Sequence, residues 1–208
     1  MDYSIAPGWK WVSDKEAVGL CERLNMLPQH RLLLLSDGSL TNFLEALSGS
    51  PVDVEIKNHE TRRLNKEEAA YLEVIASQDA IVRDVWLIQN RKKLVYARSV
   101  FPLAGLAPDR FNRGLDKDFL NKIATSIEPL GRSLTEQGLL TFKDKLAICA
   151  VHCSDINNLL NLASRAILWA KRYRLTAEAA SGGKCITASV TEIFSPELVG
   201  KPSLNAEK

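Results

Sequence analysis

Three charged residues interrupt apolar segments that have the residue pattern of β-strands. Arg83 and Arg98 lie in the two arms of a predicted hairpin, and Glu192 lies in residues 190–194 (VTEIF). On a strand, Arg83 shares its face with apolar neighbours, because alternate side chains point the same way. An unpaired buried charge costs on the order of several kcal/mol, so charges at such positions are unusual.

Two interpretations of these charges remain open on the residues alone. The first is a structural ion pair between an arginine and Glu192. The second is a binding site for a small anion, with the glutamate facing it. Burial pushes a carboxyl group towards its neutral form and a nearby arginine pushes it towards its ionised form, so such a group can serve in acid–base chemistry.

Other catalytic and metal-binding patterns give weaker signals. The chain has no glycine-rich dinucleotide motif, no phosphate-binding loop and no nucleophile elbow. Cys149, His152 and Cys153 would share one face of a helix, but a fourth soft ligand at suitable spacing is missing, so we expect packing rather than zinc binding. His30 and His59 are isolated, and we expect no catalytic role for them. We expect neither a metal nor an organic cofactor.

The overall composition is typical of a folded protein without a nucleic-acid or membrane partner. The 208 residues are 46% hydrophobic and 25% charged, with a net charge of +2. The basic runs at 91–93 and 171–174 are too short for a nucleic-acid patch. The longest purely aliphatic run is residues 32–35, no secretory signal is visible, and the four cysteines lack the spacing of a disulfide framework. These features predict a soluble, cytoplasmic protein with reduced thiols.

The pattern of helices and strands predicts an α+β fold. Helices are predicted for residues 14–25, for a segment capped by Ser39 and ended by Gly49, for a segment starting at Asn65, and for 143–170, where Asp155 would cap the second half. Strands are predicted for 52–57, 80–88, 94–102, 173–176 and 186–194, with turns at 89–93 and 182–183. Short turns between strands imply an antiparallel sheet. We expect one domain over residues 1–208, with its core at about 30–197 and a flexible C-terminal tail.

Four motifs, in order along the chain, resemble those of the chorismate–pyruvate lyase family. They are residues 34–41 (LLSDGSLT), 82–87 with 96–102 (VRDVWL and YARSVFP), 129–134 (PLGRSL), and 168–174 with 191–196 (LWAKRYR and TEIFSP). The chain is most similar to the larger, divergent branch found in photosynthetic organisms. The resemblance implies an antiparallel sheet with helical flaps that close over the ligand.

The resemblance also implies which residues form the site. Arg83 matches an arginine that binds a ligand carboxylate, and Glu192 matches a glutamate that faces the ring hydroxyl, so these two are the expected catalytic residues. Backbone groups at Leu40 and Leu130 would complete the substrate-binding set. Leu40 stands where other members carry methionine, a change that a backbone contact tolerates. Phe43 is expected among the flap residues that bury the ring.

The reaction implied by the resemblance converts chorismate to 4-hydroxybenzoate and pyruvate. Because 4-hydroxybenzoate is a precursor of quinone rings, a role in quinone biosynthesis, including plastoquinone, is expected. The segments 109–127 and 130–169 look longer than in compact members of the family. These expansions could alter the flaps, the release of product or a partner surface, and we expect them to affect the reaction itself less. The oligomeric state stays open, with a monomer slightly favoured.

The main alternative is a domain of the same fold that binds a small acid without turnover. Effector-sensing domains of some bacterial transcription regulators do this. They usually follow a DNA-binding helix-turn-helix, and the roughly 30 residues before Leu32 are too short for that motif. Two further alternatives are a lyase for another chorismate-like acid and an interaction protein that uses the helices predicted at 143–170.

Overall fold

Long antiparallel strands dominate the computed structural model of the chain, which describes residues 3–103, 122–123, 125–180 and 185–202. The strands are β1 (Ser4–Ile5), β2 (Val12–Ser13), β3 (Asp53–Arg63), β4 (Asp79–Gln89), β5 (Lys92–Pro102), β6 (Leu139–His152), β7 (Ile167–Ala179) and β8 (Cys185–Phe194). The helices are α1 (Asp14–Arg23), α2 (Pro28–Leu35), α3 (Leu40–Ser48), α4 (Lys66–Leu72), α6 (Leu130–Glu136) and α7 (Ser154–Leu159).

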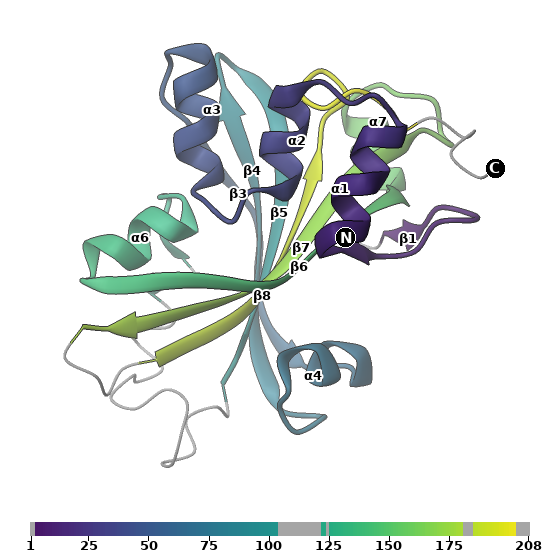
Figure 1. Cartoon of the computed structure of the whole chain (residues 1–208). Coiled ribbons are helices and arrows are strands. Elements are labelled where there is room, and N and C mark those ends of the chain that lie inside the picture. The colour runs from purple at the N-terminus through teal and green to yellow at the C-terminus, as the bar shows by residue number, and fades with distance from the viewer. Residues whose placement is uncertain (1–2, 104–121, 124, 181–184, 203–208) are drawn as a thin grey trace.

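These strands form one sheet in the order β1-β6-β7-β8-β5-β4-β3, and β2 also pairs with β6. Every pairing is antiparallel. Figure 1 shows strongly twisted strands that cross in the middle of the view, with α1, α2 and α3 towards one end of the long strands and α4 towards the other. The predicted α+β class and antiparallel sheet are confirmed.

On each face of the sheet, the buried apolar residues form two separate clusters rather than one continuous core. On the face that carries Arg83, α1, α2 and α3 pack with one end of the strands in a first cluster around Leu33 and Leu44, while Phe101 and Leu134 belong to a second. On the opposite face, a cluster around Trp86 and a cluster under α4 are likewise separate. Polar residues lie between the two clusters on both faces, so each face can hold a pocket.

Local sequence signals correctly predicted several elements. The Ser39 hydroxyl accepts a hydrogen bond from the Asn42 amide at the start of α3, and Gly49 ends that helix with a φ of 70°. Asn65 and Glu68 form a complete capping box at the start of α4. The hairpin of β4 and β5 is also as expected, although its turn is tighter than predicted, because residues 89 and 92 already pair in the ladder.

The helical prediction for residues 143–170 is wrong. Most of that segment belongs to the hairpin of β6 and β7, with only α7 between them, and Asp155 lies within α7 rather than capping it. The run from Ala147 to Val151 is buried throughout, because α1 and α2 pack against β6, and Cys149 and Val151 belong to a cluster with Ile156 of α7. A strand buried on both faces loses the alternation that distinguishes it from a helix. Cys149, His152 and Cys153 therefore do not share a helix face.

Candidate functional site

Two neighbouring rows of paired residues bring the site together on one face of the sheet. In the first row, Tyr173 on β7 pairs with Val190, which pairs with Ser99, which pairs with Arg83 on β4. Paired residues of adjacent strands point to the same face, so Tyr173 and Arg83 face the same side.

The second row carries the carboxylate. Lys171 on β7 pairs with Glu192 on β8, and Glu192 pairs with Ala97 on β5. Each of these residues is two positions from a member of the first row, so both rows share one face. One strand lies between Arg83 and Glu192, which separates their backbones by about 10 Å across the strands, twice the usual spacing. That gap is suited to a ligand one ring wide.

All members of the two rows except Lys171 line the floor of a cavity of about 470 Å³. Its walls come from the start of α3, the start of α6 and strand β6, and its lining includes Leu40, Leu130, Arg83, Glu192, Lys143 and Tyr173. The four residues predicted for substrate binding, Arg83, Glu192, Leu40 and Leu130, therefore line one cavity.

Arg83 is almost completely buried, with 2% of its surface exposed. Its Nη2 donates hydrogen bonds to the carbonyl oxygens of Ser126 (2.7 Å) and Glu128 (2.9 Å), which fixes one side of the guanidinium. Its buried Nε has no hydrogen-bond partner in the described part of the chain. Burial lowers the pKa of Arg83 to about 10, and the group stays protonated at neutral pH. An acceptor brought by a ligand would satisfy Nε.

Glu192 is also buried, and a tyrosine holds it in place. The Tyr173 hydroxyl donates a 2.8 Å hydrogen bond to Oε1 of Glu192. Among the described residues Oε2 has no hydrogen-bond partner and Glu192 forms no ion pair. Burial and the adjacent Glu192 carboxylate raise the pKa of Tyr173 well above its usual 10.0, so its hydroxyl remains a donor. One carboxylate oxygen is therefore fixed and the other is left for a ligand.

Two lysines that the sequence analysis missed add positive charge to the site. Lys143 lies 4.6 Å from the centre of the Tyr173 ring and donates a 2.5 Å hydrogen bond to the Gly38 carbonyl. Lys171 does not line the cavity itself. It lies next to Glu192 on the same face of the sheet and donates to the carbonyls of Leu33 and Ser36. Burial lowers the pKa of both lysines, and Glu192 partly offsets that effect. The only sequence signal for Lys171 was its place in the motif 168–174.

Leu40 and Leu130 occupy equivalent positions at two helix starts. Leu40 is the first residue of α3 and Leu130 is the first residue of α6. The first amides of a helix lack partners within it, because the carbonyls that would accept from them precede the helix. The two leucines thus bring backbone amides to the cavity from separate elements.

The remaining predicted residues lie elsewhere. Arg98 points to the opposite face of the sheet and forms a two-pronged ion pair with Asp84, with bonds of 2.7 and 2.9 Å. An ion pair joining Glu192 to an arginine is therefore not formed among the described residues. Phe43 does not line the cavity, although its ring lies against Gly38, which does. His30 and His59 also lie outside the lining.

Within the described residues, no three His, Cys, Asp or Glu side chains gather in a way that could hold a metal ion. Cys149 and Cys153 are buried among apolar residues, and burial raises the pKa of both thiols. None of the described helices is long and apolar enough to cross a membrane. The expanded segment 109–127 lies mostly outside the described residues, as do the turn at 182–183 and residues 203–208 of the tail.

Comparison with solved structures defines the class of fold. The structure is similar to PhnF from Mycobacterium smegmatis, with a TM-score of 0.55 and 11% identity over 84% of this chain and 71% of that one. It is also similar to the effector domain of PhnF (TM-score 0.52, 12% identity, 77% and 91% covered). The ligand-binding domain of a GntR-family transcriptional regulator from Bordetella bronchiseptica gives a TM-score of 0.50 at 19% identity, with 76% and 94% covered. At these identities the likeness establishes the fold.

The sequence itself places the chain within one family. Residues 34–200 match the family described as chorismate pyruvate-lyase Rv2949c-like. This match spans most of the chain, and the chain belongs to that family. No curated protein sequence matches the chain. The resemblance drawn from the four motifs is thereby confirmed.

Proposed function

We propose that the protein is a chorismate pyruvate-lyase that converts chorismate to 4-hydroxybenzoate and pyruvate. One observation carries this proposal. Arg83 Nε and Glu192 Oε2 are buried atoms without partners in the described part of the chain, and both residues line the same cavity. Unsatisfied buried polar atoms cost on the order of 1–3 kcal/mol each, so a site that keeps two of them is built for a ligand that satisfies both.

The charge of the site also supports a dicarboxylate. Arg83, Arg132 and Lys143 line the cavity together with two carboxylates, Asp37 and Glu192, and Lys171 lies next to Glu192 on the neighbouring strand. The side chains around the cavity therefore carry a surplus of positive charge, which favours an acidic ligand such as chorismate, with its two carboxylates. We assign one carboxylate to Arg83, which can offer a fork of donors, and the other to the side of the cavity near Lys143. The amides of Leu40 and Leu130 would hold remaining ligand oxygens.

In the proposed reaction, Glu192 handles the ring proton. The ether bond between ring carbon C3 and the enolpyruvyl oxygen breaks, and its electron pair leaves with enolpyruvate. Glu192 accepts the proton from C4, and the electrons of that C–H bond complete the aromatic ring. Enolpyruvate takes up a proton and becomes pyruvate. The Tyr173 hydroxyl holds Oε1 while Oε2 faces the substrate.

Turnover of chorismate by the purified chain tests the proposal. Formation of 4-hydroxybenzoate is followed by chromatography, and pyruvate by a coupled dehydrogenase assay. Arg83→Ala should lower kcat/KM by about a hundredfold or more, because it leaves a substrate charge unpaired. Glu192→Gln should lower kcat by about 10²-fold to 10⁴-fold.

Two exposed residues supply matched controls, Arg91→Gln at the hairpin turn and Glu136→Gln on α6. Both controls should retain full activity. Absence of turnover in the wild-type protein, or unchanged activity in both site variants, would contradict the proposal. In the cell, we place the enzyme in the cytoplasm as a source of 4-hydroxybenzoate for quinone rings.

A binding domain without turnover is the second candidate, because the fold is shared with regulator domains described as an effector domain and a ligand-binding domain. Calorimetry with 4-hydroxybenzoate and chorismate distinguishes the two candidates. Tight binding of both acids without pyruvate release would favour the binding domain. Binding accompanied by stoichiometric pyruvate release would favour the lyase.

A further inference from the structure

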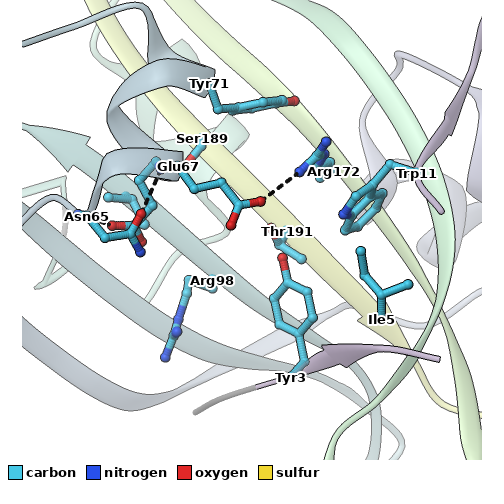
Figure 2. A pocket seen from close by; sticks show the side chains of 12 residues that line it. Tyr3, Ile5, Trp11, Asn65, Glu67, Tyr71, Arg98, Arg172, Ser189 and Thr191 are labelled. Carbon is cyan, nitrogen blue, oxygen red and sulfur yellow. Dashed lines mark hydrogen bonds and ion pairs between the residues drawn. The ribbon is translucent and has the colours of Figure 1, made fainter. Parts of the chain in front are cut away.

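A second pocket lies on the opposite face of the sheet, and the proposed reaction makes no use of it. It has a volume of about 370 Å³, and Figure 2 shows its lining. Arg172, Thr191 and Arg98 form a row of paired residues on β7, β8 and β5 that supplies its floor. Tyr71 from α4 and Trp11 from the segment before β2 supply walls.

Two aromatic rings hold the Arg172 guanidinium in the pocket. Its central carbon lies 4.3 Å from the centre of the Trp11 ring and 4.8 Å from that of the Tyr71 ring. Figure 2 shows Arg172 between these two rings. The Tyr71 hydroxyl is itself fixed by a 3.0 Å hydrogen bond to the Lys145 carbonyl. Stacking positions a guanidinium while leaving its N–H groups, which lie in its plane, available to an acceptor.

Arg172 is the cation of this pocket with the weakest pairing. Arg98 is neutralised by Asp84, with bonds of 2.7 and 2.9 Å. The carboxylate that approaches Arg172 among the described residues is that of Glu67, at 4.0 Å from Nη1, and the Glu67 side chain is 86% exposed. An exposed pair at that distance contributes little, because water and salt screen it.

The Arg172 guanidinium also keeps a donor without an acceptor. Its Nε is buried and has no hydrogen-bond partner within the described residues. Ser189, Thr191 and Tyr3 add neutral hydroxyl groups to the lining. The other carboxylate in the lining, Glu68, is paired with Arg62 at 2.6 Å. In Figure 2 the Tyr3 hydroxyl points towards Thr191 below the space that Arg172 borders. These groups can bind the polar substituents of a ligand without adding charge.

We propose that this pocket binds a small, flat carboxylic acid, with its carboxylate on Arg172. The guanidinium fork matches a carboxylate, the aromatic walls favour a planar body, and the volume admits a single ring. The Glu67 carboxylate lies near Arg172, where the ligand's carboxylate would bind, and so competes with the ligand for the guanidinium. The site is separate from the cavity of Arg83 and Glu192, so it stands whether or not the protein is a lyase.

Titration with benzoate, followed through the Trp11 indole N–H in a ¹H–¹⁵N NMR spectrum, tests the proposal. Trp11→Phe identifies the resonance among those of the four tryptophans. In the wild-type protein the Trp11 signal should shift saturably with benzoate. Arg172→Gln should weaken that binding at least about tenfold, the effect expected for loss of a charge-assisted hydrogen bond.

Two further variants make the result specific. Arg83→Gln, in the cavity on the opposite face, should leave the Trp11 titration unchanged and so serves as the matched control. Glu67→Gln removes the competing carboxylate and should tighten binding by about threefold, a size typical of an exposed ion pair. Because Glu67 is exposed, this variant should fold even where Arg172→Gln does not.

Three outcomes would overturn the proposal. They are the absence of a saturable Trp11 shift in the wild-type protein, equal benzoate affinity in Arg172→Gln, and unchanged or weaker affinity in Glu67→Gln. The last outcome would mean that Arg172 and Glu67 form a structural pair.

Discussion

The Tyr173 hydroxyl donates a 2.8 Å hydrogen bond to Oε1 of Glu192, and both residues are buried in the cavity wall. The hydrogen bond fixes one carboxylate oxygen, while Oε2 has no hydrogen-bond partner among the described residues. Tyr173 also contacts Lys143 through its ring, so it links the carboxylate to a cation of the site. A single side chain thus orients both charges.

Tyr173→Phe should reduce catalysis while preserving the packing of the ring. Loss of a hydrogen bond to a charged group costs about 1.5–3 kcal/mol, which corresponds to a fall in kcat of about ten- to a hundredfold. KM should change less, because the substrate keeps Arg83. Steady-state kinetics on chorismate measures both constants, with the melting temperature as a check on folding. A kcat equal to that of the wild type would show that Glu192 does not depend on this bond.

Arg83→Lys should distinguish the contribution of the positive charge to substrate binding from that of the guanidinium's fork of donors. Lysine keeps the positive charge but cannot bond both the Ser126 and Glu128 carbonyls and still offer a fork to the ligand. We expect KM for chorismate to rise by about tenfold or more, with a smaller effect on kcat. Kinetics of this variant beside Arg83→Ala gives the comparison. Equal KM values for Arg83→Lys and the wild type would rule out a fork at this position.

The affinity for the acidic ligand should fall at alkaline pH because of Lys143. Burial holds the pKa of Lys143 below its ordinary 10.5, and Glu192 offsets only part of that effect. The cation is present below this lowered pKa and is lost as the pH rises through it, so binding is strongest near neutral pH. Calorimetry with 4-hydroxybenzoate from neutral pH to about pH 10 should show the decline.

Lys143→Arg provides the control for that experiment, because arginine stays charged over this pH range. Its binding curve should fall less steeply than the wild-type curve, because only Lys171, Arg83 and the phenol of the ligand then titrate in this range. A variant curve that falls as steeply as the wild-type curve would remove Lys143 from the binding site.

Glu68→Gln should destabilise the protein at neutral pH but not in acid. Burial of Glu68 favours the neutral form, yet hydrogen bonds from Arg62 and from the Asn65 amide outweigh it and hold the pKa of Glu68 below 4.5. A lowered pKa stabilises the fold above the unfolded value, and this stabilisation is lost as the pH falls through the folded value.

The expected loss for Glu68→Gln at neutral pH is about 1 kcal/mol, the size typical of a helix cap. Urea unfolding of both proteins at neutral pH and at about pH 3 measures it. The difference should shrink at the acidic pH. A difference that persists there would assign the effect to packing rather than to charge.

Much of the fold could be predicted where the signal is local. Caps such as Ser39 and Asn65 act within a few residues, and the hairpin of β4 and β5 has apolar arms around a polar turn. Strand β6 and the start of β7 could not be recognised, because burial on both faces removes the alternation of a half-buried strand, whereas residues 173–176 of β7 were predicted as a strand. Once residues 143–170 are placed on strands, Lys143 reaches the sheet face of Tyr173, a position that the helical prediction concealed.

The site could be predicted only in part, because only some of its residues have a distinctive signal in the sequence. Arg83 and Glu192 were conspicuous because each charge interrupts an apolar strand. The family motifs favoured a ligand site over an ion pair for Glu192 and added Leu40 and Leu130. Tyr173 and Lys143 carry no comparable signal, because a tyrosine in a strand and a lysine next to an aspartate are ordinary. The catalytic roles of Arg83 and Glu192 stay predictions, as do the single-domain boundaries at residues 1–208.

Because side chains alternate along β7 and β8, successive residues of the same two strands face the two sites on opposite sides of the sheet, and only the backbone of these strands separates the sites. Lys171 and Glu192 lie on the face of the sheet that holds one cavity, which Glu192 lines, while their chain neighbours Arg172 and Thr191 line the pocket on the opposite face. A shift in the backbone of either strand therefore moves a wall of both compartments at once. Substitutions that enlarge one compartment by moving these strands will reshape the other, whereas changes confined to the helices can alter them separately.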